Sequence, residues 1–108
     1  MADAPVPRRN PFADVAPALG RYTDEVLFGD VSERPELSKR DRSLITVAAL
    51  IGMYRTGELP FHLRRALENG VTREEIVELI NHLAFYAGWP CASAAVSLAR
   101  TAFQDAGV

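Results

Sequence analysis

The sequence LITVAALIGMY, from Leu44 to Tyr54, is the longest apolar run in the chain and decides its fold. It has about half of the ~20 residues that a membrane span requires. It contains few β-branched residues, so a helix is favoured over a buried strand. Since it is apolar all round, we expect a central helix with contacts on every side. Ser38 as N-cap, with Asp41 at the third helical position, predicts where this helix begins.

The next segment, ELPFH at residues 58–62, predicts the start of another helix, which ends at Asn69 and Gly70. A proline is tolerated there because the first helical turn has N–H groups without an intrahelical partner. Glu58 and His62 stand four positions apart, so a helix that includes both places them on one face. A carboxylate beside an imidazole favours protonated histidine, which suits acid/base chemistry. The same pair is also typical of a structural ion pair at a helix start.

The N-terminal part predicts an arm followed by an interrupted helix. Residues 1–11 hold three prolines and no apolar period, so we expect a flexible or surface-bound arm. Apolar residues recur at helical spacing from Phe12 to Phe28, with an interruption expected near Pro17 and an end at Gly29. Residues 30–37 are predicted to form a connecting loop.

The C-terminal part predicts two further helices. Thr72 and Glu75 form a capping box that starts a helix ending near Ala87, with Phe85 pointing outward. Pro90 begins the last helix, at residues 91–103, whose many small residues let neighbouring helices approach closely. The sequence therefore predicts one all-α domain, a bundle of about five helices over residues 12–108.

Composition excludes several classes of function. The net charge of −2 offers no basic surface for nucleic acid, and no membrane span is expected. One cysteine, Cys91, excludes an internal disulfide and a Cys-x-x-Cys redox pair, and the absence of a signal-peptide segment predicts a cytoplasmic protein. At 48% hydrophobic residues the chain exceeds what a small bundle can bury, so self-association is expected.

Other side chains are candidates for a site, each beside a structural alternative. His82, with Glu78 before it and Tyr86 after it, is either a second acid/base residue or a half-buried packing residue. Tyr86 and Trp89 either line a pocket or pack ordinarily. Cys91 at a helix start is either a reactive thiol or a small buried apolar residue. The two histidines lack metal-ligand spacing, which argues against a metal site, so we expect no metal and no cofactor.

Five segments in order resemble the carboxymuconolactone decarboxylase family, and the resemblance covers residues 12–103. They are RPELS (34–38), RSLIT (42–46), ELPFHL (58–63), ALENGVTREEI (66–76) and LAFYAGWP (83–90). The resemblance implies an all-helical, alkylhydroperoxidase D-like fold. It also implies a homo-oligomer, commonly a hexamer built as a trimer of dimers, with sites at or near subunit contacts.

The peroxide-reducing branch of this family uses a Cys-x-x-Cys-x-x-x-His motif and an upstream glutamate, from which this chain departs. Arg55 and Glu58 stand at the two cysteine positions, and Ser43 stands at the glutamate position. Only His62 of that motif remains. Without a resolving thiol the peroxidase cycle cannot close, unless Cys91 has taken over.

The other branch removes carbon dioxide from γ-carboxymuconolactone in aromatic degradation. Arg42, Glu58 and His62 match its pattern. The resemblance implies proton transfer by His62, orientation of His62 by Glu58, and binding of the substrate carboxylate by Arg42. His82 is the second candidate acid, and Tyr86 and Trp89 are candidate substrate contacts. We therefore expect a decarboxylase acting on a small carboxylated lactone or keto acid, the alternatives being a non-catalytic ligand-binding oligomer and a thiol-dependent peroxide reductase.

Overall fold

The computed structural model describes residues 11–108, whose regular secondary structure is all helical, with no strand among them. The predicted all-α fold is therefore confirmed. The predicted arm lies almost wholly outside the described residues, so its boundary with the domain stays a prediction. Contacts along the chain divide it into two compact units, the first ending at Glu36 and the second spanning Leu37–Val108.

The first unit contains the short helix α1 (Pro17–Tyr22), a π-helical turn η1 (Thr23–Phe28) and a 3₁₀ turn η2 (Val31–Glu33). The prediction that Pro17 interrupts a longer helix was wrong, because Pro17 is the first residue of α1. The reason is that the first turn does not need the N–H that proline lacks. Gly29 ends the π turn as predicted: a Cβ there would stand 2.7 Å from the carbonyl oxygen of Glu25.

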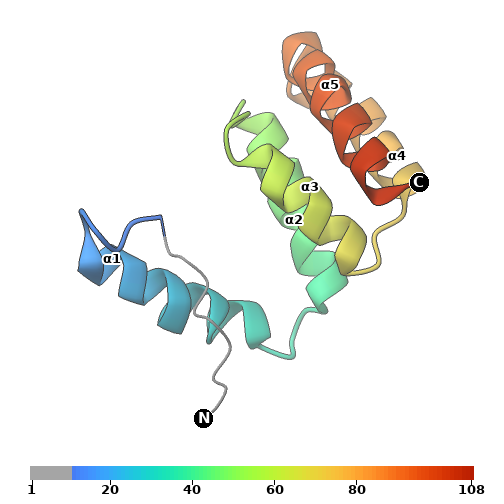
Figure 1. The fold of residues 1–108 in the computed structure, drawn as a ribbon. Coiled ribbons are helices and arrows are strands. Elements are labelled where there is room, and N and C mark those ends of the chain that lie inside the picture. Colours follow the sequence, from blue (N-terminus) through green and yellow to red (C-terminus); the bar gives the residue numbers. More distant parts are fainter. Residues whose placement is uncertain (1–10) are drawn as a thin grey trace. The chain divides into compact units, whose positions relative to one another are not determined.

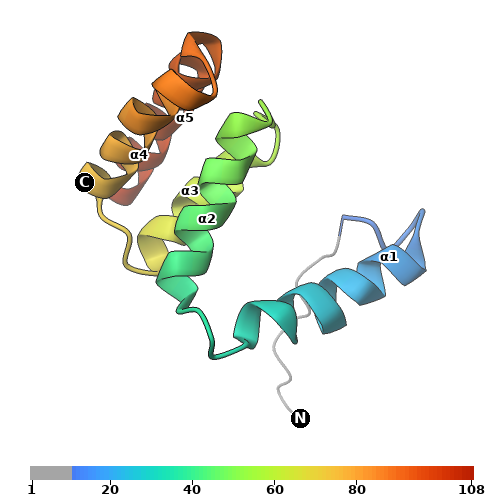
Figure 2. The same cartoon turned by 180° about the vertical axis from the view of Figure 1, so that it is seen from behind.

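The second unit is built from α2 (Lys39–Gly52), α3 (Leu59–Glu68), α4 (Arg73–Tyr86) and α5 (Trp89–Ala106). α2 lies beside α3, and α4 lies beside α5 (Figures 1 and 2). The two pairs join through contacts of α2 with α4 and of α3 with α5, and α2 also touches α5. α3 and α4 consequently occupy opposite corners of this four-helix unit.

The predicted helix starts are formed by side-chain caps. The Oγ of Ser38 accepts a hydrogen bond of 3.0 Å from the backbone N–H of Asp41. Thr72 and Glu75 complete the capping box, each side chain accepting from the other's backbone N–H at 3.1 and 2.9 Å. These bonds satisfy donors that would otherwise lack partners at the starts of α2 and α4.

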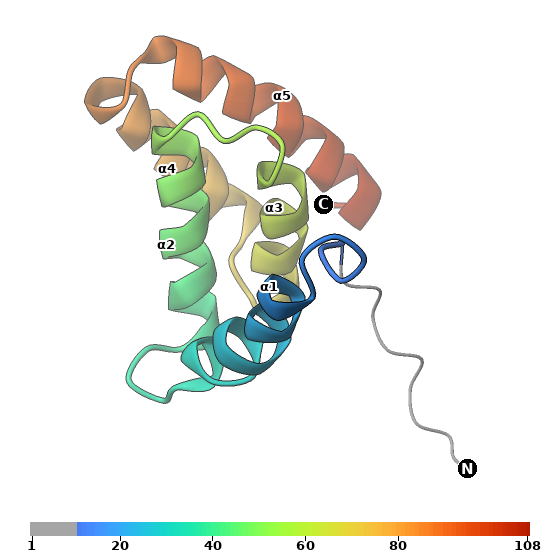
Figure 3. The same cartoon turned by 90° about the vertical axis from the view of Figure 1, so that its left-hand side faces the viewer.

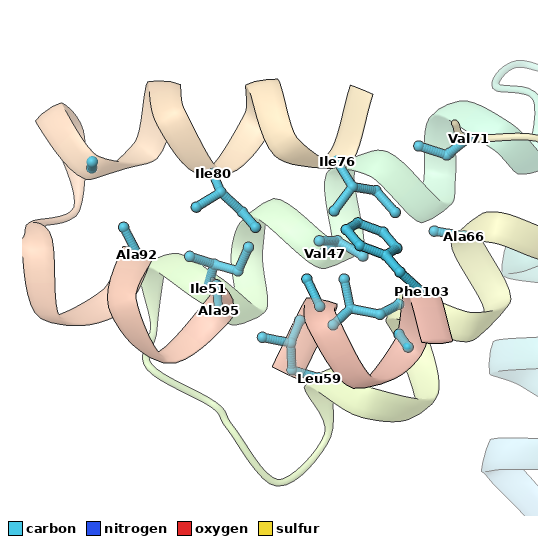
Figure 4. Close-up of a cluster of buried hydrophobic side chains, with 14 residues drawn as sticks. Val47, Ile51, Leu59, Ala66, Val71, Ile76, Ile80, Ala92, Ala95 and Phe103 are labelled. Carbon is cyan, nitrogen blue, oxygen red and sulfur yellow. The ribbon is translucent and has the colours of Figure 1, made fainter. Parts of the chain in front are cut away.

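The core lies between the four helices (Figure 4). Its largest fully buried side chains are those of Val47, Ile51, Leu59, Leu63 and Ile76. α5 contributes mainly alanines to the core, and these are the small residues that were predicted to let neighbouring helices approach closely.

The expectation of contacts on every side of α2 is not met within this chain. Ile45 and Met53 on or next to α2 remain 55% and 60% exposed. Phe85 on α4 is 79% exposed, which confirms its predicted outward direction. These apolar side chains are uncovered because the four helices bury only the faces that they turn toward one another.

We expect Thr72→Ala to lower the free energy of unfolding by about 1 kcal/mol, since the N–H of Glu75 loses its acceptor. Urea denaturation at fixed protein concentration measures this. Thr72→Ser keeps a hydroxyl acceptor and should stay close to the parent protein. Equal midpoints for the alanine and serine variants would contradict the role of the capping box.

Candidate active site

The first turns of α3 place three charged or titratable side chains along one helix. Glu58 occupies the N-cap position and is exposed, whereas His62 is half-buried and Arg65 is partly buried. The backbone N–H of His62 donates to the carbonyl of Glu58 at 3.4 Å. Spacings of four and three residues put all three side chains on neighbouring surface positions.

The burial of His62 follows from its neighbours in the sequence. Leu59 and Leu63, which precede and follow it, are 1% and 0% exposed, so the face of α3 that carries them packs into the core. His62 lies at the edge of that face. The ring of Phe61 stands edge-on to the imidazole, with centroids 4.9 Å apart. The imidazole is therefore partly shielded from water by both the core and an aromatic ring.

Burial is the main reason why the pKa of His62 is lowered from its usual value, and the positive charge of Arg65 lowers it further. The carboxylate of Glu58 raises it but does not outweigh the other two effects. The carboxylate thus favours protonated histidine, as expected, but burial and Arg65 together outweigh it. Among residues 11–108, no ion pair joins Glu58 and His62, because Glu58 extends into solvent. The resting imidazole is neutral near pH 7.

Arg65 is a functional candidate that the sequence analysis did not single out. Its position one turn after His62 was visible in the sequence as an i, i+3 pair. What the sequence did not reveal is that Arg65 is only partly exposed and acts on the imidazole more strongly than Glu58 does.

Arg42 does not meet His62 within one chain. It lies in the first turn of α2, where its side-chain Nε is buried. α2 and α3 run antiparallel (Figure 3), and the Nδ2 of Asn69 donates to the Oγ of Ser43 at 2.9 Å. Asn69 follows His62 by seven residues, or about 10 Å along a helix axis. Arg42 therefore belongs to the opposite end of the α2/α3 pair.

His82 is also separate from His62, because α4 and α3 occupy opposite corners of the unit. Its ring stacks on that of Tyr86 with centroids 4.6 Å apart, and it borders a hollow of about 570 Å³ between α2 and α4. Phe85 and Trp89 form a second, edge-to-face pair at 5.5 Å. Tyr86 and Trp89 are 79% and 65% exposed, and among residues 11–108 none of the hollows described places either of them beside His62.

Cys91 is a free, partly buried thiol in the first turn of α5. Within residues 11–108, no three His, Cys, Asp or Glu side chains gather in a way that could hold a metal ion. The helices of the same residues include none that is long and apolar enough to cross a membrane.

We expect a folded-state pKa for His62 below 6.5, measurable from its imidazole resonances in an NMR pH titration. Arg65→Gln should raise this pKa because it removes a cation, and Glu58→Gln should lower it because it removes an anion. Movement of the His62 resonance in the opposite direction in either variant would refute these electrostatics.

Comparison with known proteins identifies the family. Residues 17–101 match the carboxymuconolactone decarboxylase family model. The chain is 44% identical over 87 residues to 4-carboxymuconolactone decarboxylase of Acinetobacter baylyi, covering 81% of this chain and 65% of that protein. It is 38% identical over 81 residues to nitrosuccinic acid decarboxylase npaB of Metarhizium robertsii, covering 75% and 57%. The chain thus spans less than two thirds of the length of either relative. It belongs to the carboxymuconolactone decarboxylase family.

Proposed function

We propose that the protein is a cytoplasmic, cofactor-free decarboxylase of a small carboxylated lactone or a related keto acid. Two relatives named as decarboxylases, of 4-carboxymuconolactone and of nitrosuccinic acid, support this class of substrate. The observation that carries the proposal is His62: a half-buried imidazole with a lowered pKa, between a carboxylate and a guanidinium on one helix.

The reaction needs a proton donor placed beside a developing negative charge. When carbon dioxide leaves, the electron pair of the broken C–C bond moves into the lactone carbonyl, and a proton must then be returned to carbon. Neutral His62 can donate a hydrogen bond from its ring N–H. A bound substrate carboxylate raises its pKa, so that the ring takes up the proton that it later returns. Burial and Arg65 favour the neutral ring, so the imidazolium formed in the complex gives up its proton readily once the carboxylate has left as carbon dioxide. Glu58, whose charge acts on the ring, is the candidate for orienting it once its exposed carboxylate turns toward the imidazole.

The substrate carboxylate requires a cation, and two arginines are candidates. Arg65 is close to His62 on the same helix, and we assign it to the same site. Arg42 can act there only across a subunit contact, because in its own chain it lies at the far end of α2 and α3. His82 stays the second candidate acid. Tyr86 and Trp89 stay the candidate substrate contacts, and a neighbouring subunit would cover their exposed rings.

The proposal includes a homo-oligomer, with a hexamer as the expected form. Support comes from apolar side chains that the chain itself leaves uncovered, including Ile45, Met53 and Phe85. Exposed apolar surface of this kind is typical of faces that bind another protein.

We expect His62→Ala to lower kcat by about 10²–10⁴-fold for 4-carboxymuconolactone, because a proton donor in the transition state contributes about that much. Release of carbon dioxide measures turnover, and circular dichroism checks the fold. Arg64→Ala, an exposed change on the same helix, should retain full activity. Undiminished turnover by His62→Ala would exclude this site, and a large loss in His82→Ala alone would transfer the proton-transfer role to His82.

We expect light scattering after size exclusion to give a mass several times that of the 11.9 kDa chain. Phe85→Arg should reduce this mass, since it places a charge on an apolar contact. Arg64→Glu is the matched control and should leave the assembly intact. A monomeric parent protein would contradict the oligomer and, with it, any role of Arg42 across a contact.

A further inference from the structure

A hollow of about 330 Å³ lies between α4 and α5, and none of the residues used in the proposed mechanism lines it. Its floor is apolar and buried: Ile80 of α4 is 5% exposed and Phe103 of α5 is 6% exposed. Val77 and Val96 form the walls and are 40% and 43% exposed. The volume is at the lower end of the range for small-molecule sites. The hollow therefore suits a compact ligand with an apolar body.

Helical spacing explains why these side chains meet. On α5 the lining residues Val96, Arg100 and Phe103 follow one another at intervals of four and three. On α4 Val77 and Ile80 stand three apart. Each set forms a stripe on one face of its helix, and the two stripes face the same hollow. Since regular helices hold both stripes, the shape of the hollow is set before any ligand arrives.

The charged side chains at the rim of the hollow are arginines. Arg73 and Arg100 both line it, and no Asp or Glu side chain does. Arg73 is already engaged: its guanidinium lies over the ring of Phe103 at 5.0 Å and donates to the carbonyl of Val108 at 2.9 Å. Arg100 is exposed and forms no ion pair with any residue between 11 and 108. Its guanidinium is thus available to an anion bound over the apolar floor.

We propose that this hollow binds a small organic carboxylate, with its apolar body over Ile80 and Phe103 and its carboxylate on Arg100. Guanidinium and carboxylate form charge-assisted, often bidentate hydrogen bonds, which fix the orientation of such a ligand. Asn81 and Gln104 border the hollow and can donate further hydrogen bonds. The inference is independent of the decarboxylase proposal, because it uses neither His62 nor its neighbours on α3.

Isothermal titration calorimetry with benzoate tests the site, since benzoate combines a flat apolar body with one carboxylate. We expect binding with a Kd of about 1 mM or below. Arg100→Gln should weaken it about tenfold or more by removing the charged hydrogen bonds. Benzamide, which has the same shape without the charge, should bind as weakly to the parent protein as benzoate does to the variant.

Two control variants locate the binding. Arg21→Gln removes an exposed arginine of α1 and should bind benzoate as the parent protein does. His62→Ala removes the proposed catalytic imidazole and should retain the part of the binding that Arg100→Gln removes, because that part belongs to the hollow between α4 and α5. Loss of binding in His62→Ala with full binding in Arg100→Gln would show that benzoate occupies the α3 site, and would overturn the proposal. Equal affinity for benzamide and benzoate, or no heat up to about ten times the expected Kd, would overturn it as well.

Discussion

The burial of Leu59 and Leu63 is the constraint on which the candidate active site depends. These side chains are buried where α3 packs against α2 and α5. The same packing leaves the neighbouring His62 half-buried. Taking an imidazole out of water penalises its charged form. The packing that stabilises the core therefore also lowers the pKa of His62, the residue proposed to transfer a proton. A substitution that loosens the packing of α3 is expected to change this pKa as well.

The arrangement of helices adds a second consequence. With α3 and α4 at opposite corners of the unit, one chain cannot bring His62 and His82 together. The antiparallel pairing of α2 and α3 likewise keeps Arg42 away from His62. A site that used all of these residues would need more than one subunit, and the exposed apolar side chains of α2 and α4 provide surface for such a contact.

Much of the fold was predictable because it rests on local interactions. Ser38 and the Thr72–Glu75 box have side chains whose hydrogen bonds depend only on nearby residues, and both were found as expected. The effect of Pro17 was harder to predict, since a proline can start or break a helix. The site was only partly predictable. Sequence spacing paired Glu58 with His62, but the net shift of the His62 pKa depends on burial and on Arg65, which only the packed structure reveals.

The pH dependence of kcat/KM for 4-carboxymuconolactone tests the central claim most directly, because it reports the ionisation of the free enzyme. If the His62 imidazolium returns the proton, kcat/KM should fall as the pH rises through a pKa below 6.5. Arg65→Gln should move this fall to higher pH, and Glu58→Gln should move it to lower pH. A profile that is flat across this range, or that does not move in either variant, would contradict proton transfer by His62.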